Sequence, residues 1–266
     1  MPDSGVLDPL PALWPWAALA GGLVVGSFAN VCIHRLPEHR SVVKPRSRCP
    51  RCAALIRAAD NVPIFSYLVL GGRCRACRVV ISPRYPLVEA ANGVMYFALA
   101  RLMGPTPGAV VAMALVTALL VLSLIDYEHH LLPDAVTLPG IAVGLAASLL
   151  AGPPTPLSAA AAAAGGYLAL CVVAKVYERT RRLEGLGQGD WKMTAMLGAF
   201  LGWEKLLLVV FVATLAGTVV GLGLMAFGGR SSRHPLPLGT FLGLTGIAVV
   251  FLGDPVIEWY RGLLRV

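Results

Sequence analysis

Charged side chains are scarce in this chain of 266 residues: Asp, Glu, Lys and Arg make up 14% of it, and hydrophobic residues make up 57%. A soluble domain of this length carries nearly twice that share of charge. The apolar residues recur in long runs along the chain instead of collecting in one core segment. The scarcity of charge therefore argues against a soluble domain and predicts an all-α polytopic membrane protein.

The N-terminal segment lacks the signals of a cleaved targeting peptide. Residues 1–12 hold no basic cluster, and no small-residue cleavage site follows the first apolar run, so we expect a retained span. About eight transmembrane helices are expected, the sixth only about 20 Å long and so suited to a wet pocket. Their approximate ranges are 13–33, 86–103, 109–126, 135–150, 159–176, 191–203, 204–227 and 236–252.

These runs divide the chain into a first span (1–33), a polar segment (34–85) and a membrane-embedded remainder (86–266). The polar segment holds 11 of the 22 Lys and Arg, and the loops around residues 175–192 and 230–233 hold seven more. Only Arg101, Lys205, Arg261 and Arg265 fall on the other predicted side. This asymmetry predicts a cytoplasmic polar segment and an outer N-terminus. Because the charge is split among membrane-adjacent loops, we expect lipid head groups as its partner and no nucleic acid.

The polar segment contains two CxxC pairs, Cys49/Cys52 and Cys74/Cys77. Thiolates two residues apart can bind one metal from a tight turn, and two such turns complete a tetrahedral four-sulfur site. Two disulfides are the alternative, which a reducing cytoplasmic face disfavours. The sequence therefore predicts a small zinc-binding cytoplasmic domain between the first two spans. A closed four-thiolate site leaves no open coordination position, so the zinc should be structural.

Two aspartates lie at the boundaries of apolar spans, where a carboxylate is costly enough to suggest function. Asp126 closes the run 109–125, and Asp190 follows Gly187-Gln-Gly189 at the start of another span. A facing pair of carboxyls is suited to acid–base peptide hydrolysis. The ordinary alternatives are a solvated span end for Asp126 and a helix N-cap for Asp190.

Other polar residues near these positions have simpler interpretations. His129 and His130 could form a second metal site with Asp126 and Asp134. We favour loop histidines at the membrane surface, with Asp134 capping the next span. Glu89 could accept a substrate amine or stay solvated. The apolar run 62–70 is consistent with a short hairpin or with an interfacial segment.

Four ordered blocks of sequence make a resemblance specific. The first block is 26–37, and the second is the two CxxC pairs together with their flanks at 60–63 and 84–89. The third is 124–134, and the fourth is 185–203, which contains Gly-x-Gly-Asp. With these blocks the chain resembles type IV prepilin leader peptidases, which belong to the Gly-x-Gly-Asp class of intramembrane aspartyl proteases. The resemblance implies Asp126 and Asp190 as the catalytic pair and the four cysteines as zinc ligands.

The resemblance also implies a bifunctional enzyme of the bacterial inner membrane with its active site on the cytoplasmic side. Its substrates would be prepilins or pseudopilins of type IV pilus or type II secretion systems. Such enzymes remove a short basic leader and then methylate the new N-terminus with S-adenosylmethionine. The chain has no glycine-rich turn in a strand–helix context, so the cofactor is implied by resemblance alone.

Two further hypotheses remain. A polytopic transporter or channel with a zinc-stapled cytoplasmic domain is the main alternative, although the chain shows no convincing internal repeat and its acids gather on one face. If the protein is a peptidase, helix polarity suggests roles for the pair: Asp190 starts a helix and would be the resting carboxylate, whereas Asp126 ends one and would be the resting acid.

Overall fold

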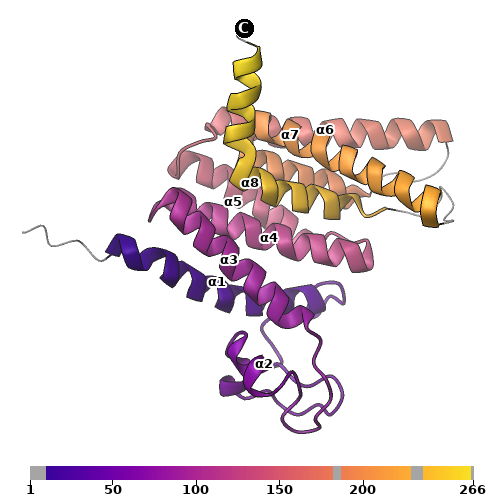
Figure 1. Cartoon of the computed structure of the whole chain (residues 1–266). Helices are drawn as coiled ribbons and strands as arrows, with labels where there is room; N and C mark the ends of the chain where they lie inside the picture. The colour runs from indigo at the N-terminus through magenta and orange to yellow at the C-terminus, as the bar shows by residue number, and fades with distance from the viewer. Residues whose placement is uncertain (1–9, 182–186, 229–235, 265–266) are drawn as a thin grey trace, which may run out of the picture. The chain divides into compact units, whose positions relative to one another are not determined.

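The computed structural model describes residues 10–181, 187–228 and 236–264, and within them the fold is built from helices (Figure 1). Some residues used in the sequence analysis lie outside the described residues. They are four arginines counted in the charge asymmetry (Arg182, Arg230, Arg233 and Arg265) and the first two residues of the 185–203 block. The described part has isolated β-bridges but no β-strand. The helices are α1 (Leu10–Arg35), η1 (Ala58–Asn61), α2 (Phe65–Val69), α3 (Arg84–Met103), α4 (Pro107–His129), α5 (Asp134–Leu150), α6 (Pro156–Arg181), α7 (Gln188–Gly228) and α8 (Leu238–Leu263).

Seven of the eight predicted spans fall within these helices, and the eighth, 236–252, begins two residues before α8, which confirms an all-helical multi-pass protein. Among the described residues, α1, α4, α6, α7 and α8 are long and apolar enough to cross a membrane. The helix α7 contains two of the predicted spans, and α5 is apolar but shorter. The predicted orientation of the chain in the membrane stays a prediction.

The long helix α7 is two helices joined at a break. Gly202 has a backbone φ of 74° and ψ of −177°, outside the helical region, close to the predicted boundary between residues 203 and 204. A Cβ at this position would lie 2.7 Å from Pro154 Cβ and 3.0 Å from Ser158 Oγ. Both the positive φ and the close approach require glycine. The first part of α7 is therefore short, as the sequence indicates.

The described residues form two compact units. One contains residues 1–32 and 41–113, in which α1 and α3 pack closely. Cβ atoms built on Gly22 and Gly26 would lie 2.8 Å from the Cα atoms of Gly93 and Glu89, respectively. Asn92 Nδ2 donates to Gly22 O at 2.8 Å, and Asn30 Nδ2 donates to Tyr85 O at 3.0 Å. These contacts fix α1 and α3 as antiparallel neighbours.

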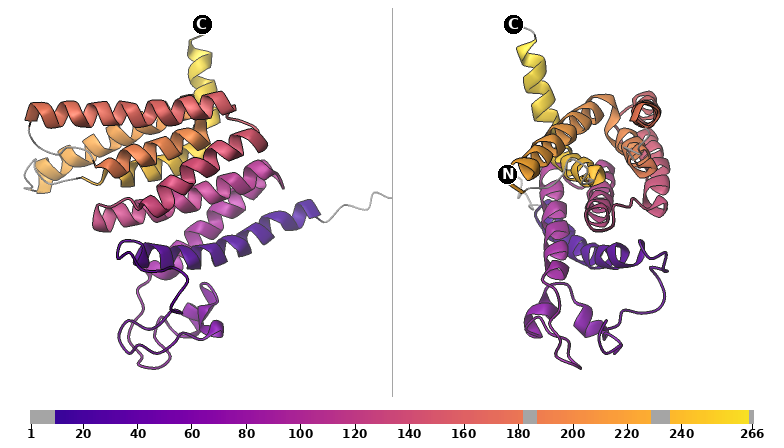
Figure 2. Two further views of the ribbon diagram at one scale, coloured as in Figure 1. Left: turned by 180° about the vertical axis from the view of Figure 1, so that it is seen from behind. Right: turned by 90° about the vertical axis from the view of Figure 1, so that its right-hand side faces the viewer.

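The other unit contains residues 33–40 and 114–266, and its core lies between α4, α7 and α8. The helix α7 packs against α5, α6 and α8 (Figure 2). Partway along its length α8 changes direction, as Figure 1 shows, and it contains Pro255, which cannot donate the helical hydrogen bond. Fully buried side chains of this core include Leu119, Leu122, Met193, Met196, Leu197, Val209 and Leu242.

Candidate active site and metal-binding cluster

Asp126 lies in the last turn of α4 and is buried, with 5% of its surface exposed. Its Oδ2 accepts two hydrogen bonds from Thr240, in the first turn of α8: the backbone N–H donates at 2.6 Å and Oγ1 at 3.0 Å. The same hydroxyl lies 3.2 Å from Ser123 O. The N-terminus of α8 therefore faces this carboxyl, an arrangement that favours negative charge. Asp126 is thus a held, buried acid and not a solvated span end.

Asp190 lies in the first turn of α7 and is also buried, with 9% exposed. Its Oδ2 accepts the backbone N–H of Gly187 at 3.2 Å, and its own N–H donates to Gly187 O at 3.1 Å. This is one half of a capping box, in which the third helical residue reaches back to the cap position. The alternative that Asp190 is itself the N-cap residue is therefore wrong.

Gly189 is required by packing at this turn. A Cβ built on it would lie 2.8 Å from Leu132 Cβ, in the segment that follows α4. The short contact brings the turn before Asp190 against the segment after Asp126. The glycine therefore helps to bring the two aspartate-bearing segments together.

Both aspartates line one cavity of about 650 Å³. They come from the last turn of α4 and the first turn of α7. The volume of the cavity is within the usual range of about 300–1,000 Å³ for ligand-binding clefts. Other lining residues are Leu36, His39, Arg40, His130, Leu131, Leu132, Pro133, Asp134, Ala135, Gly187, Gln188, Gly189 and Lys192.

Asp134 has a different role from the predicted one. The helix α5 begins at Asp134, its cap position is Pro133, and no side chain caps it. The carboxylate of Asp134 instead accepts hydrogen bonds from Lys192 Nζ at 2.7 and 2.8 Å, linking the starts of α5 and α7. Among the described residues, the four-cysteine cluster is the only group of three or more potential metal ligands, so the second metal site is not formed there.

The four cysteines predicted as ligands converge. The sulfur atoms of Cys49, Cys52, Cys74 and Cys77 all lie within 4.8 Å of one another. The Sγ atoms of Cys49 and Cys77 are 3.8 Å apart, close to the ~3.8 Å edge of a tetrahedron with ~2.3 Å zinc–sulfur bonds. A disulfide would bring two sulfurs to about 2.05 Å, and all six cysteines are unbridged. The geometry therefore fits a metal ion and not the disulfide alternative.

The local backbone also favours metal binding at this cluster. Hydrogen bonds from the backbone N–H groups of Cys52 and Arg51 lower the pKa of the Cys49 thiol to about 6. The thiolate is the form that binds metals, so this shift favours Cys49 as a ligand, whereas burial and hydrogen bonds with the other cysteines raise the pKa of the Cys52 thiol to about 11.

Glu89 lies in α3 and is buried, with 8% exposed. Its Oε2 accepts the backbone N–H of Ile64 at 2.8 Å. The solvated alternative for this residue is therefore wrong, because its carboxylate joins the polar segment to α3.

Sequence reasoning missed Thr240, Ser123, Leu132 and Lys192. Thr240 is 114 residues from Asp126, and a Gly-Thr pair after prolines has no distinctive motif. Lys192 could have been suspected as a cation two residues after the predicted catalytic Asp190. Its partner Asp134, however, depends on how α5 and α7 pack.

Comparison with known proteins places the chain in a family. Residues 20–103 match the family model "Bacterial Peptidase A24 N-terminal domain", and residues 113–222 match "Type IV leader peptidase family". No solved structure matches the chain.

Curated relatives carry the name "Prepilin leader peptidase/N-methyltransferase". The protein of this name from Burkholderia pseudomallei is 40% identical over 263 residues, covering 90% of this chain and 85% of the relative. The one from Pseudomonas aeruginosa is 35% identical over 283 residues and covers 98% of both. At this identity and coverage, the chain belongs to the type IV leader peptidase family.

Proposed function

We propose that this protein cleaves the leader peptide from prepilins or pseudopilins and then methylates the exposed N-terminus. The observation that carries the peptidase proposal is the pair of buried carboxyls, Asp126 and Asp190, lining one cavity from two helices. The relatives' names, which pair a prepilin leader peptidase with an N-methyltransferase, support both activities.

The mechanism follows from two interacting carboxyls that share one proton. Their mutual repulsion keeps one protonated and one ionised, so the pair supplies an acid and a base together. The ionised carboxylate removes a proton from a water molecule as it attacks the scissile carbonyl carbon. The protonated partner donates a hydrogen bond to the carbonyl oxygen and polarises it. Collapse of the tetrahedral intermediate breaks the C–N bond as the leaving amine takes up the proton that the carboxylate removed from water.

The hydrogen bonds of both residues suit this chemistry. Among the described residues, the hydrogen bonds that Asp126 accepts from Thr240 and Asp190 accepts from Gly187 fall on Oδ2, and Oδ1 of each carboxyl is the oxygen we assign to water or substrate. Buried, held carboxyls lose little orientational freedom during the reaction. The two side chains are therefore positioned before the substrate arrives.

The assignment of acid and base between the two remains a prediction. Helix polarity suggested Asp190 as the resting carboxylate and Asp126 as the resting acid. The α8 N-terminus facing Asp126 works against that order, because both carboxyls then lie near a helix N-terminus. Site-resolved titration decides it: ionisation of Asp126 before Asp190 would overturn the suggested order.

The cofactors are assigned on different grounds. We propose zinc at Cys49, Cys52, Cys74 and Cys77, where a four-thiolate site would hold the polar segment folded and take no part in bond cleavage. S-adenosylmethionine is proposed as the methyl donor from the relatives' names alone. The uneven distribution of Lys and Arg and the family resemblance support the bacterial inner membrane, with the active site on the cytoplasmic side.

The decisive experiment is digestion of a prepilin peptide by the full-length protein in detergent, followed by mass spectrometry. Asp126→Asn and Asp190→Asn should each lower cleavage at least about a thousandfold, since each removes half of the acid–base pair. Asp254→Asn is the matched control, because this acid is exposed and pairs with Lys205 instead of lining the cavity. Cleavage that survives either active-site change would overturn the proposal.

The transporter or channel alternative gains no support. The family models that match the chain are those of peptidases, and the cavity gathers both aspartates at the ends of helices. A related protease with a different substrate would be recognised in the same digestion, because it would leave the prepilin peptide intact.

A further inference from the structure

The short helix α2 exposes an apolar face in the middle of the polar segment. Phe65, Leu68 and Val69 are 65%, 69% and 64% exposed. Their spacing of three and four residues places them on one side of the helix. We call these three side chains the α2 face. Tyr67 points elsewhere, because its hydroxyl donates to Ile81 O at 3.3 Å inside the polar segment.

The start of α2 is tied to a position inside the ends of α1 and α3. The residue before α2, Ile64, donates its N–H to Glu89, five residues or about 7 Å of rise inside the start of α3. Glu89 packs on Gly26 of α1, and α1 continues for nine residues beyond that contact. Even with the reach of a glutamate side chain toward its helix N-terminus, Ile64 lies within the length of these helices.

The polar segment around α2 is strongly basic. Residues 41–83 contain eight Lys and Arg and one acid, Asp60. That acid is already paired, since Arg75 donates to both of its oxygens at 2.6 to 3.0 Å, and this holds the pKa of Asp60 below its usual range. Four thiolates around one divalent ion would still leave the segment positive. Its charge complements anionic lipid head groups.

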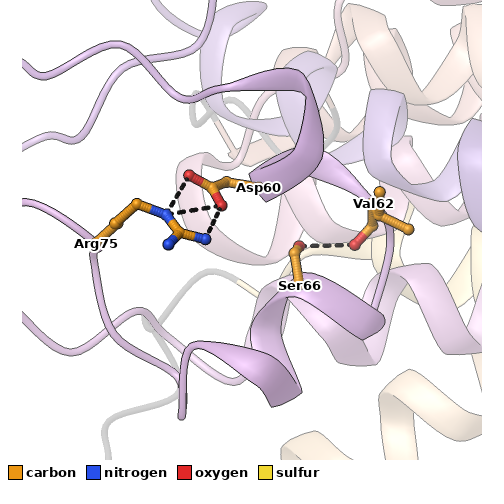
Figure 3. Close-up of polar contacts among 4 residues, drawn as sticks. All are labelled: Asp60, Val62, Ser66 and Arg75. Carbon is orange, nitrogen blue, oxygen red and sulfur yellow. Dashed lines mark hydrogen bonds and ion pairs between the residues drawn. The ribbon is translucent and has the colours of Figure 1, made fainter.

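Contacts at and before the N-terminal end of α2 hold it in place. The Arg75–Asp60 pair joins the second CxxC turn to η1, and Ser66 Oγ donates to Val62 O at 2.7 Å at the start of α2 (Figure 3). Glu89 binds the amide of Ile64, the residue before α2. The apolar side chains are therefore presented outward by a segment tied both to the cysteine cluster and to α3.

We propose that the α2 face is inserted into the bilayer at the level of the head groups and upper acyl chains. The apolar side chains supply burial in lipid, and the surrounding basic residues contact anionic head groups. The polar segment is then attached to the membrane through the α2 face as well as through its connections to α1 and α3. The proposal needs α1 to span the membrane, but it does not depend on the peptidase activity.

The test is site-specific photo-crosslinking in the full-length protein. The photoreactive residue p-benzoylphenylalanine is placed at Leu68 or at Leu55, a leucine of similar exposure (54%) in the first cysteine turn. Each protein is reconstituted with its zinc in nanodiscs of phosphatidylethanolamine and phosphatidylglycerol, irradiated, and analysed by mass spectrometry. We expect several-fold more lipid adduct at position 68 than at position 55, with phosphatidylglycerol enriched among the adducts.

Three results would overturn the proposal: equal lipid yields at the two positions, adducts at 68 only to a second copy of the chain, or adducts at 68 only to an added prepilin. A second measurement uses different variants and the fluorescence of an introduced tryptophan. After subtraction of the wild-type signal, the fluorescence of Phe65→Trp should be quenched by lipids brominated in the acyl chains, and the fluorescence of Leu55→Trp should not. Equal quenching of both would reject the inserted position. Zinc content equal to wild type shows that each variant is folded.

Discussion

At the scale of single residues, Thr240 shows how a side chain outside the catalytic pair can control it. Its hydroxyl and its N–H both bind Oδ2 of Asp126. Thr240→Val keeps the shape and the N–H but removes the hydroxyl. A hydrogen bond to a charged group contributes about 1.5–3 kcal/mol, so we expect a roughly 10- to 100-fold fall in kcat with KM nearly unchanged.

Steady-state cleavage of a prepilin peptide measures this effect. Thr240→Ser retains the hydroxyl and should recover most of the activity, which a purely structural role would not require. A rise in KM alone, or a valine variant as active as wild type, would show that the hydroxyl does not position Asp126.

The residues differ in how far the sequence could reveal them. Asp126 and Asp190 stand out because carboxyls at span boundaries are costly, and the structure brings both to one cavity. Thr240 gives no such signal, since threonine is unremarkable in an apolar helix and its partner is 114 residues away. The state of Glu89 was equally hidden, because its burial depends on the Ile64 amide packing against α3.

At the scale of helices, the break at Gly202 sets the length of the first part of α7. Gly202→Ala places a Cβ at a positive φ, which costs about 1–2 kcal/mol, and crowds Pro154 at 2.7 Å. We expect the melting temperature to fall by roughly 4 °C or more, with cleavage retained at low temperature because Asp190 is at the other end of that part.

Gly223→Ala is the matched control in the second part of α7, because a Cβ there has no neighbour within 4 Å. Alanine favours a helix over glycine by up to about 1 kcal/mol, so this variant should be as stable as wild type or more stable. Equal melting temperatures for the two variants would show that the break tolerates a side chain.

Long apolar helices are the elements that a sequence predicts best, since each bilayer crossing needs a long apolar run. Seven of the eight expected spans lie within helices, the eighth starts two residues before α8, and the break in α7 is within two residues of the expected one. The run 62–70 stayed undecided, because a short apolar run fits strand and helix equally, and it forms the five-residue α2. The start of α5 was misjudged because Lys192, distant in sequence, takes the carboxylate of Asp134.

At the scale of the whole molecule, the two proposed activities should separate. Cleavage uses Asp126 and Asp190, whereas methyl transfer to an amine needs no pair of acids that activates water. Asp126→Asn should therefore abolish cleavage and still methylate a peptide supplied already cut. Transfer of a labelled methyl group from S-adenosylmethionine to the cut peptide measures this; loss of both activities in a folded variant would mean that one site serves both reactions.

Metal removal tests how far the cysteine cluster and the aspartate site depend on each other. The four sulfurs lie in the first structural unit, and both aspartates lie in the second. Cys49→Ser, or treatment with a chelator, removes a metal that holds two turns of a segment with little core of its own. We therefore expect rapid proteolysis within residues 41–83, while the digestion pattern of the 114–266 unit is unchanged.

The effect on cleavage should be smaller than the effect on the fold of the cysteine segment. A four-thiolate zinc site has no open position for substrate or water, so it cannot activate the attacking molecule. Cleavage should fall severalfold at most, whereas Asp190→Asn should abolish it without loss of metal. Cys171→Ser, outside the cluster, controls for loss of a thiol. Unchanged metal content and unchanged protease resistance in Cys49→Ser would contradict the structural role of the site.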